Sequence, residues 1–475
     1  MTRPTSAVTN SFRRQALSDL SRSIDSANST ETGEKFYIGL SRSSSLNPLV
    51  SDDNISSLLF QSSFEDNLQS VKILGANSFV VPRINWSDGQ TYDEYDNNGE
   101  NQFYVLNSAN DVFVCVKQGK ESYDGAPKPS TVEPTRAGAV NGLSKTFRTA
   151  DGYLWRQVAI LSNLAVANFQ TSDWMPIKTV FDTGAFLPIS QDSDQLNLLQ
   201  EESVSGEIIN LAIDQPGTGY TSIPTLSITG NGNSASFTCD VFNGEISNII
   251  IDSDGNGEIT GHGSGYDYAA VSISGGGGSG ASIRAVISPG EGLNADPVSS
   301  LKGKDLMLQT DVVGNESGTI RDNAQFNQIG IIKGIKEYAS SDFFVSNTGN
   351  ALKALQLSSV VQPANWTNSV NLSFIDIANS SKVGKIYYYD DQNNKLYYYQ
   401  DVETGYDDFA ALSSIQLEND ATTSATIDSL IDPDFKAHSG EVLYINNLGD
   451  PDFDYTTGVL RSSDQTEDIR IIIQL

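Results

Sequence analysis

An internal repeat in residues 205–290 limits what this chain can fold into more than any other feature. Two copies share a Gly-Tyr pair followed by a β-prone stretch, and the pairs Gly219-Tyr220 and Gly265-Tyr266 lie 46 residues apart. Each copy opens on Gly-Glu-Ile, at residues 206–208 and 244–246. A unit this short cannot bury a hydrophobic face alone. We therefore expect the two copies to pack on each other as one β module, inserted in the host fold.

The composition of the whole chain is that of a β protein. Glycine (40 residues) far exceeds proline (15), and Ser, Thr, Asn and Asp are abundant, which favours many turns between short strands. We predict a mainly β (α+β) fold: a multidomain β-sandwich-like body with N-terminal helices and the inserted Gly-rich β-repeat module. We expect an N-terminal helical and strand segment over 1–78, a first β domain over 79–204, the repeat module over 205–290, and a C-terminal β domain with a Tyr-rich hairpin over 291–475.

Local patterns place two helices near the start of the chain. Apolar residues at helical spacing form one narrow face in the first helix, and a second helix-like segment spans 52–74. A short strand is expected between them, over 35–40. The first apolar face consists of Phe12, Ala16, Leu17, Leu20 and Ile24, and the second buried set consists of Leu58, Leu59, Phe60, Phe64, Leu68 and Val71.

Turn-forming residues between β-prone runs predict two hairpins. In the first β domain, residues 107–111 join strands over 102–106 and 112–116. In the C-terminal domain, residues 390–394 separate the Tyr-rich strands 385–389 and 395–399. Further strands are expected over 79–81, 153–160 and 468–473.

The net charge of -30 bears on the kind of partner. A chain this acidic repels phosphate backbones and anionic membranes, so nucleic-acid binding and membrane binding are both disfavoured. Only two cysteines, Cys115 and Cys239, are present, too few for a disulfide framework or a thiolate metal cluster, which suits assembly in a reducing cytoplasm. We expect no signal peptide and no membrane span, because no apolar stretch is long enough.

The sequence indicates no catalytic residues and no cofactor. His262 and His438 are the two histidines of the chain, so a histidine-rich metal centre is not expected. His438 precedes Ser439 and Glu441, but proximity in sequence does not make a nucleophile and a base. We interpret His438 as a structural residue.

Two glycine-containing segments imitate binding motifs. Asp252, Asp254 and Asn256 stand at positions one, three and five of a calcium-loop pattern, but Gly263 stands at the twelfth position, where a carboxylate is needed. We predict a polar turn there and no bound metal. The segment Gly230-Asn231-Gly232-Asn233-Ser234-Ala235 fits a dinucleotide-binding pattern only on paper, because a β-prone run follows it instead of a helix. It is interpreted as a turn.

Two other chemistries stay open. Two carboxylates suffice for a glycosidase, and acidic pairs abound in this chain. The tyrosines between Tyr387 and Tyr399 could form an aromatic platform for sugars, although such tyrosines more often pack across strands with their hydroxyls at the rim.

Six segments, in their order along the chain, resemble the baseplate wedge subunit family of contractile-tailed bacteriophages. The resemblance covers roughly residues 10–200 and 290–475 and leaves out the repeat. Residues 448–463 also depart from the family pattern, with Gly449-Asp450-Pro451 where a shorter linker is usual. The segments are Val80-Val81-Pro82-Arg83-Ile84-Asn85-Trp86, Asp151-Gly152-Tyr153-Leu154-Trp155-Arg156, Trp174-Met175-Pro176-Ile177, Gln325-Phe326-Asn327-Gln328-Ile329-Gly330-Ile331-Ile332, His438-Ser439-Gly440-Glu441-Val442-Leu443-Tyr444-Ile445-Asn446-Asn447 and Asp464-Gln465-Thr466-Glu467-Asp468-Ile469.

The resemblance implies a structural, non-enzymatic subunit of the virion. Such a subunit forms a homodimer and joins other baseplate wedge proteins, and six wedges close around a central hub. It carries no catalytic residues over to this chain. Trp86 and Trp155 are expected to be core or interface anchors, and Asp151-Gly152 a turn into a strand. The alternatives are a receptor- or glycan-binding tail protein, which would use the repeat module or the Tyr-rich hairpin, and a tail-associated glycosidase.

Overall fold

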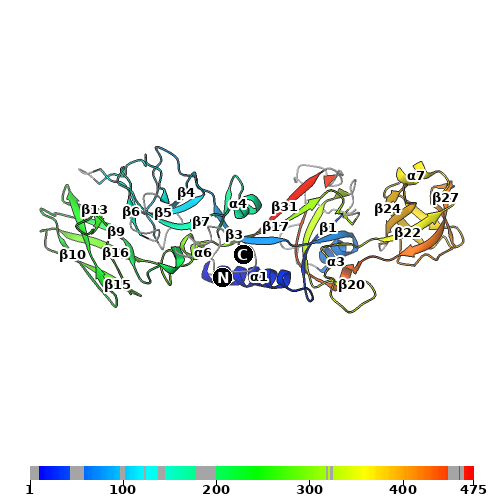
Figure 1. Cartoon of the computed structure of the whole chain (residues 1–475), viewed down its shortest axis with the longest axis horizontal. Helices are drawn as coiled ribbons and strands as arrows, with labels where there is room; N and C mark the ends of the chain where they lie inside the picture. Colours follow the sequence, from blue (N-terminus) through cyan, green and yellow to red (C-terminus); the bar gives the residue numbers. More distant parts are fainter. Residues whose placement is uncertain are drawn as a thin grey trace, which may run out of the picture. The chain divides into compact units, whose positions relative to one another are not determined.

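Strands dominate the chain in the computed structural model, which describes residues 10–42, 58–96, 102–121, 125–136, 145–177, 199–316, 319–320, 325–401, 403–447, 459–460 and 465–474. Strands account for 47% and helices for 13%, which confirms the mainly β fold class (Figure 1). The chain forms two compact units. The first comprises Met1–Arg22, Asn77–Met307 and Ile472–Leu475, and the second comprises Ser23–Ala76 and Leu308–Ile471. The first β domain and the repeat module therefore fall in one unit.

Four elements carry the chain from one unit into the other, and one of them is strand β3 (Ala76–Pro82), whose first residue belongs to the second unit. The other three are helix α1 (Asn10–Ser29) and strands β17 (Asp305–Val313) and β31 (Thr466–Gln474). The first predicted helix is confirmed, with Leu17 and Ile24 buried, but Phe12 is 65% exposed and does not belong to the buried face. Lys35 ends the helical segment by donating from Nζ to the carbonyl oxygens of Ala27 and Thr30, where a cation offsets the negative end of the helix dipole.

In the first unit, a four-stranded sheet contributes most of a core of aromatic side chains. Its order is β4-β5-β7-β6, and the predicted hairpin is confirmed by the antiparallel pairing of β4 with β5. Trp155 in β7 is fully buried, stacked on Tyr153 with ring centroids 5.4 Å apart. Strands β3 and β8 belong to another four-stranded sheet, of order β31-β17-β3-β8, and α4 and α6 are short helices of the first unit. Their bounds are β3 (Ala76–Pro82), β4 (Tyr104–Leu106), β5 (Asp111–Lys117), β6 (Phe147–Arg148), β7 (Leu154–Ile160), α4 (Asn163–Phe169), β8 (Trp174–Ile177) and α6 (Pro297–Ser300).

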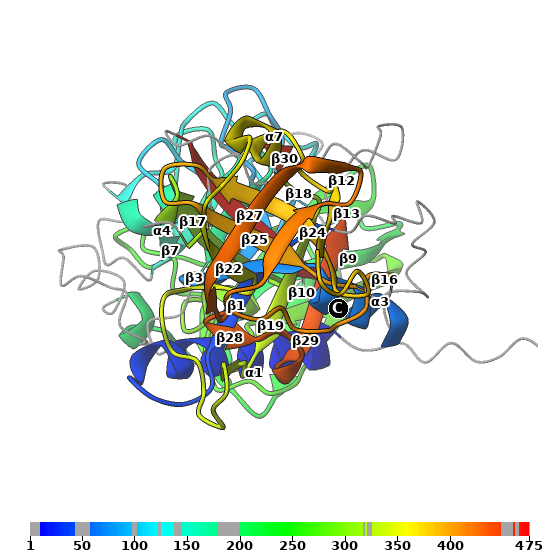
Figure 2. The same cartoon turned by 90° about the vertical axis from the view of Figure 1, so that its right-hand side faces the viewer.

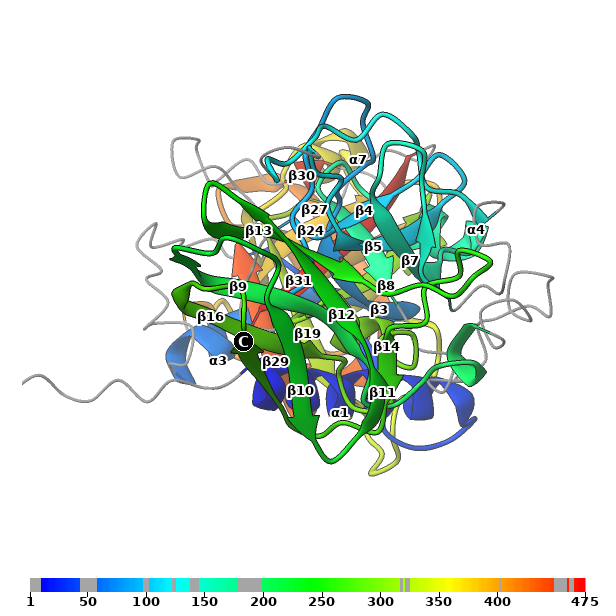
Figure 3. The same ribbon diagram turned by 90° about the vertical axis from the view of Figure 1, so that its left-hand side faces the viewer.

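The repeat module is built by strand exchange between its two copies (Figure 3). Every pairing between its strands joins one strand from residues 206–243 to one from residues 244–290, so neither copy forms a sheet alone. This confirms that the copies pack on each other. The pairs are β9 (Ile208–Thr218) with β16 (Ser279–Ile287), β10 (Thr225–Gly230) with β15 (Ala269–Ser274), β11 (Asn233–Ala235) with β14 (His262–Ser264) and β12 (Phe237–Phe242) with β13 (Glu245–Ile251).

The Gly-Tyr pairs that define the repeat make reciprocal contacts across the module. A Cβ on Gly278 of the second copy would lie 2.5 Å from the ring of Tyr220 in the first. The equivalent Cβ on Gly232 of the first copy would lie 2.4 Å from the ring of Tyr266 in the second. Both rings are buried, so each tyrosine occupies the space left by a missing side chain of the other copy. Glycine is required at these two positions by close approach rather than by backbone conformation.

The second unit contains a five-stranded sheet of order β21-β2-β1-β19-β29. Strand β19 pairs with β1 on one side and β29 on the other. Helix α3 covers the sheet by placing the buried ring of Phe64 on the paired residues Gly39 and Gly330. The bounds are β1 (Phe36–Ser41), α3 (Leu58–Asp66), β2 (Leu68–Ile73), β19 (Gln328–Lys333), β21 (Thr348–Asn350) and β29 (Glu441–Asn447), with short strands β18 (Gln325–Phe326), β20 (Lys336–Glu337), β28 (Phe435–Lys436) and β30 (Val459–Leu460) and the 3-10 helix η3 (Ala437–Ser439).

The prediction of one helix over 52–74 is wrong beyond Asp66. Asn67 ends α3 with its side chain and backbone N–H groups both donating to Ser63 O, and residues 68–73 form β2 instead. The spacing of Phe64, Leu68 and Val71 imitates a helix, but pairing with β1 and β21 decides the structure. Residues 52–57 lie outside the described part of the chain.

A closed six-stranded barrel, which the sequence did not suggest, lies within the C-terminal domain (Figure 2). Its order is β22-β25-β24-β23-β26-β27. Trp366 of helix α7, fully buried, packs at 6.3 Å centroid distance from Phe374 in the barrel core. The bounds are β22 (Lys353–Ser358), α7 (Pro363–Thr367), β23 (Ser373–Asp376), β24 (Val383–Asp390), β25 (Lys395–Tyr399), β26 (Ser414–Leu417) and β27 (Asp420–Ile431).

The reciprocal contacts of the repeat module predict that substituting Gly232 or Gly278 destabilises the protein to a similar extent. Gly232→Ala and Gly278→Ala should each lower the free energy of unfolding by about 1–3 kcal/mol, because each new methyl group overlaps a buried tyrosine ring. Gly255→Ala is the control, since a Cβ there meets nothing within 4 Å. Denaturant titrations of the full chain measure all three. A large loss for one glycine and none for the other would contradict the reciprocal arrangement.

Candidate functional site

His438 is held between two carboxylates at the end of helix α3. Its Nδ1 lies 3.2 Å from Glu65 Oε2 and its Nε2 lies 2.9 Å from Asp66 Oδ1. Both ring nitrogens can donate at once only in the protonated ring. The hydrogen bond to Glu65 and the two nearby negative charges raise the pKa of His438 above its ordinary value. Ser439 Oγ donates to Lys436 O and accepts from Lys336 N, so the hydroxyl serves the backbone and does not contact the ring.

His262 lies in a buried polar network that fixes the repeat module to the β4–β7 sheet. Arg156 forms a bidentate ion pair with Glu207, and its Nε and Nη2 donate to Thr146 Oγ1 at 3.0 and 2.9 Å. Thr146 Oγ1 lies 2.9 Å from His262 Nε2, and His262 Nδ1 lies 2.9 Å from Ile208 O.

The partners of this network define its protons. Ile208 O can only accept, so His262 carries its hydrogen on Nδ1. Thr146 Oγ1 accepts from Arg156 and therefore donates its own hydrogen to Nε2 of His262. Burial and then the charge of Arg156 lower the pKa of His262 to about 4, so the ring is neutral at physiological pH. Both ring nitrogens of His262 are therefore engaged in hydrogen bonds within the protein.

The two segments that imitate binding motifs are turns. Asp254 Oδ1 accepts from the backbone N–H groups of Asn256 and Glu258, both at 2.9 Å, so the carboxylate closes its own loop. Residues 230–235 lead from β10 into β11 and not into a helix. Among the described residues, no group of three or more His, Cys, Asp or Glu side chains is arranged to hold a metal ion. Cys115 and Cys239 are both buried thiols.

The Tyr-rich hairpin forms as predicted, with β24 paired to β25, but its rings mostly face protein. Tyr389 and Tyr398 lie in the barrel core, while Tyr387 and Tyr397 are buried on the outer face beside Leu352 and Ala354. Tyr387 Oη donates to Gln69 Oε1 of β2 at 2.6 Å. The hairpin therefore ties the barrel to the five-stranded sheet, and these four rings offer no open platform to a sugar.

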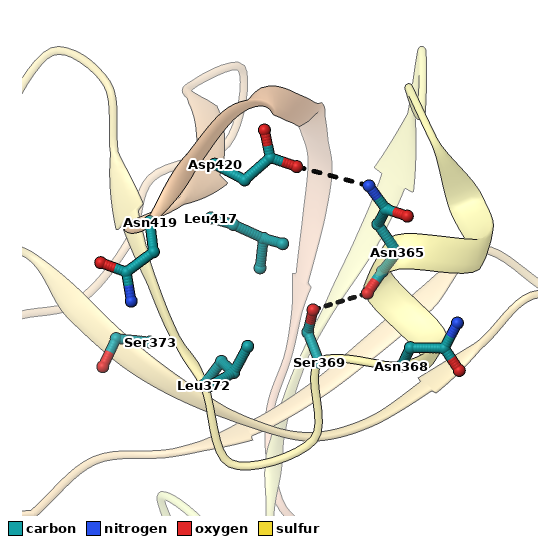
Figure 4. A pocket seen from close by; sticks show the side chains of 8 residues that line it. All are labelled: Asn365, Asn368, Ser369, Leu372, Ser373, Leu417, Asn419 and Asp420. Atoms are coloured by element: carbon teal, nitrogen blue, oxygen red, sulfur yellow. Dashed lines mark hydrogen bonds between the residues drawn. The ribbon is translucent and has the colours of Figure 1, made fainter.

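One pocket opens at the end of the barrel, between α7 and the turn from β26 to β27 (Figure 4). Its volume is about 210 Å³. Leu372 and Leu417 supply apolar surface, and the remaining lining consists of amide, hydroxyl and carboxylate groups. The lining residues are Asn365, Asn368, Ser369, Leu372, Ser373, Leu417, Asn419 and Asp420.

Hydrogen bonds fix the back of this pocket. Asn365 Nδ2 donates to Asp420 Oδ2 at 3.3 Å and to Thr423 Oγ1 at 2.9 Å, and Ser369 Oγ donates to Asn365 O at 2.6 Å. Sequence reasoning missed this site, because Asn365 and Asp420 belong to no local motif. They meet only because β23 pairs with β26, which sets Phe374 opposite Leu417.

Replacing His438 should give a pH-dependent loss of stability. Because the pKa of His438 is raised in the folded state, its contribution is fully present below the unfolded pKa of about 6.5 and is lost as pH rises through the folded pKa. The side chain is 53% exposed, so His438→Gln should cost at most about 1 kcal/mol after solvent screening. Denaturant titrations at about pH 5.5 and about pH 9 should show the difference only at the lower pH. An equal loss at both pH values would contradict the charge pairing.

Breaking the buried ion pair should destabilise the first unit strongly. Glu207→Leu leaves the guanidinium of Arg156 buried without its partner, which should lower the free energy of unfolding by roughly 3–5 kcal/mol. The double variant Arg156→Met/Glu207→Leu removes both charges and should recover most of that loss. Thermal and denaturant unfolding of the unchanged chain, the single variant and the double variant decide this, and a double variant no more stable than Glu207→Leu would refute the coupling.

Comparison with known proteins gives no family for the chain. No protein-family model matches it, and no curated protein matches it. No helix in the described ranges is long and apolar enough to cross a membrane.

Proposed function

We propose that this chain is a structural subunit of the baseplate wedge of a contractile-tailed bacteriophage. The observation that carries the proposal is that four of the six segments resembling that family, although far apart in sequence, pair with one another in twos. Residues 80–82 in β3 pair with residues 174–176 in β8. Residues 328–332 in β19 pair with residues 442 and 444–447 in β29.

The side chains of these segments also support a structural role. Val80, Met175, Ile332 and Trp155 are each at most 1% exposed. Trp86, which is partly buried, donates from Nε1 to Ser130 Oγ at 3.1 Å. Of the polar residues in the same segments, Arg156 forms the buried ion pair with Glu207 and Asp151 holds a turn. These side chains build cores and loops, which suits a subunit whose task is shape and assembly.

Asp151 shows how a polar residue in these segments is used. Its Oδ2 accepts from Ser130 Oγ, Thr131 N and Val132 N at 2.8–3.0 Å, and its Oδ1 accepts from Thr149 Oγ1 at 2.5 Å. The predicted turn at Asp151-Gly152 therefore leads into β7 and also fastens the loop that contains Ser130. Both carboxylate oxygens are occupied by the fold.

The proposal includes a homodimer that joins other wedge proteins, without nucleic acid or membrane as a partner. Like-charged copies with a net charge of -30 need apolar anchors to associate. Large exposed apolar side chains occur on the barrel, where Leu412 is 81% exposed and Ile377 is 50% exposed. They are close together, since Ile377 N donates to Ser414 O at 2.8 Å. Such residues are candidate anchors for assembly in the host cytoplasm.

Self-association should strengthen as salt rises from low to moderate concentration. The repulsion between acidic copies is screened over a Debye length of about 10 Å at about 0.1 M salt, whereas apolar contacts persist. Sedimentation and sizing across a salt series measure this. A monomer at every salt concentration, or a dimer that dissociates as salt rises, would contradict the proposed interface.

Co-expression with the other tail proteins of the same phage tests the wedge assignment itself. Sizing should then recover a complex that contains this chain and at least one further baseplate protein. Leu412→Asp places a charge at the most exposed apolar side chain of the barrel. It should weaken the homodimer or the complex with the other tail proteins. Leu443→Asp, at a 43% exposed position in β29, is a control for a charge elsewhere. Failure to join any tail protein would reject the assignment.

A further inference from the structure

The pocket at the end of the barrel presents hydrogen-bonding groups that the fold does not use. Asn419 and Ser373 lie on one side, and Asn365 and Asn368 on the other (Figure 4). In the described part of the chain, the side chains of Asn368, Ser373 and Asn419 have no hydrogen-bond partner in the protein. Asn368 and Asn419 are exposed, and Ser373 is partly buried.

Asp420, the charged group of the pocket, is saturated. Its Oδ1 accepts from Thr422 N at 3.0 Å and Thr422 Oγ1 at 2.6 Å. Its Oδ2 accepts from Thr423 Oγ1 at 2.6 Å and Asn365 Nδ2 at 3.3 Å. These bonds use the roughly four lone-pair positions of a carboxylate. The hydrogen bonds from Thr422 and Thr423 lower the pKa of Asp420 to about 2, so it stays ionised at physiological pH.

This saturation determines the charge of the ligand that fits. A cation would need free carboxylate lone pairs, which Asp420 lacks. An anion would face the charge of Asp420 in a chain of net charge -30, so it is disfavoured. The remaining groups are amides and a hydroxyl, each of which both donates and accepts. Their complement is a neutral molecule with several hydroxyl groups.

The apolar surface and the volume of the pocket further narrow the class of ligand that it can bind. Leu372 is 47% exposed and forms, with Leu417, an apolar wall between the two polar sides. The C–H face of a pyranose ring fits such a wall while its hydroxyls reach the amides. The volume of about 210 Å³ is below the roughly 300–1,000 Å³ of sites for drug-sized ligands. The pocket therefore holds one ring and not an extended chain.

We infer that the barrel binds a single neutral pyranose unit in this pocket, with Asn368, Asn419 and Ser373 as the hydrogen-bonding groups. Asn365 and Asp420 are positioning residues that shape the wall. The inference does not depend on the wedge assignment, because the site lies within the barrel and uses none of the segments that carry the resemblance. It differs from the sugar platform considered for the Tyr-rich hairpin, whose rings are mostly buried.

Saturation-transfer NMR on the full chain tests the site with methyl glycosides of glucose, galactose and mannose. Glucuronate tests an anion of the same shape, glycerol tests a non-specific polyol, and an oligosaccharide of the best sugar distinguishes the end of a glycan from a free sugar. At least one neutral glycoside should bind with a dissociation constant on the order of millimolar, as expected for a small, open site. Chelation of calcium should leave binding unchanged.

Matched variants localise the binding. Asn368→Ala/Asn419→Ala should weaken it at least about tenfold without unfolding the chain, because neither side chain has a protein partner among the described residues. Asn315→Ala, an exposed asparagine after β17, should bind as the unchanged protein does. The inference is overturned if no neutral glycoside binds, if glucuronate or glycerol binds equally well, if calcium is required, or if the double variant keeps its affinity.

Discussion

Strand β19 lies between β1 and β29, and these two pairings hold the five-stranded sheet together. Its partners come from opposite ends of the chain, around residues 36–41 and 441–447. A buried strand must satisfy its backbone N–H and C=O groups, and water cannot do so there. The second unit can therefore close only when distant segments meet. Closing such long loops costs entropy that grows slowly with length, so the sheet tolerates the barrel placed between β19 and β29.

The strands of the repeat module also depend on pairing partners from another part of the chain, which here is the other copy of the repeat. Each copy lacks the partners for its own strands, and exchange with the other copy supplies them. The exchange also matches shape, since Tyr220 and Tyr266 each lie where the other copy has glycine. Because each copy is incomplete alone, the module gains its stability only as a pair.

Polar residues in this chain serve two separate purposes. Arg156, Glu207, Thr146 and His262 are buried and fully paired, which fixes the module to the neighbouring sheet. A buried network of this kind tolerates no unpaired member. At the end of the barrel, by contrast, Asn368 and Asn419 are exposed and without protein partners among the described residues. The first set holds the structure, and the second is free to contact a ligand.

Local sequence patterns determined the elements whose partners are near in the chain. The hairpin of β4 and β5, the Tyr-rich hairpin and helix α1 follow from turn residues and apolar spacing. The repeat also determined that two copies would pack together, and the polar residues around Asp254 predicted the turn that its carboxylate closes. Each of these features depends on residues that are neighbours in sequence, or on copies of the same residues.

Tertiary structure decided what no local pattern contains. Leu68 and Val71 have helical spacing, yet they lie in a strand because β1 and β21 flank them. The closed barrel depends on the pairing of β22 with β27, some seventy residues later, and the pocket depends on Asn365 meeting Asp420. His262, whose pKa is lowered, and His438, whose pKa is raised, have the same intrinsic chemistry. Their difference comes from burial beside Arg156 in one case and from two nearby carboxylates in the other, and only folding brings those groups together.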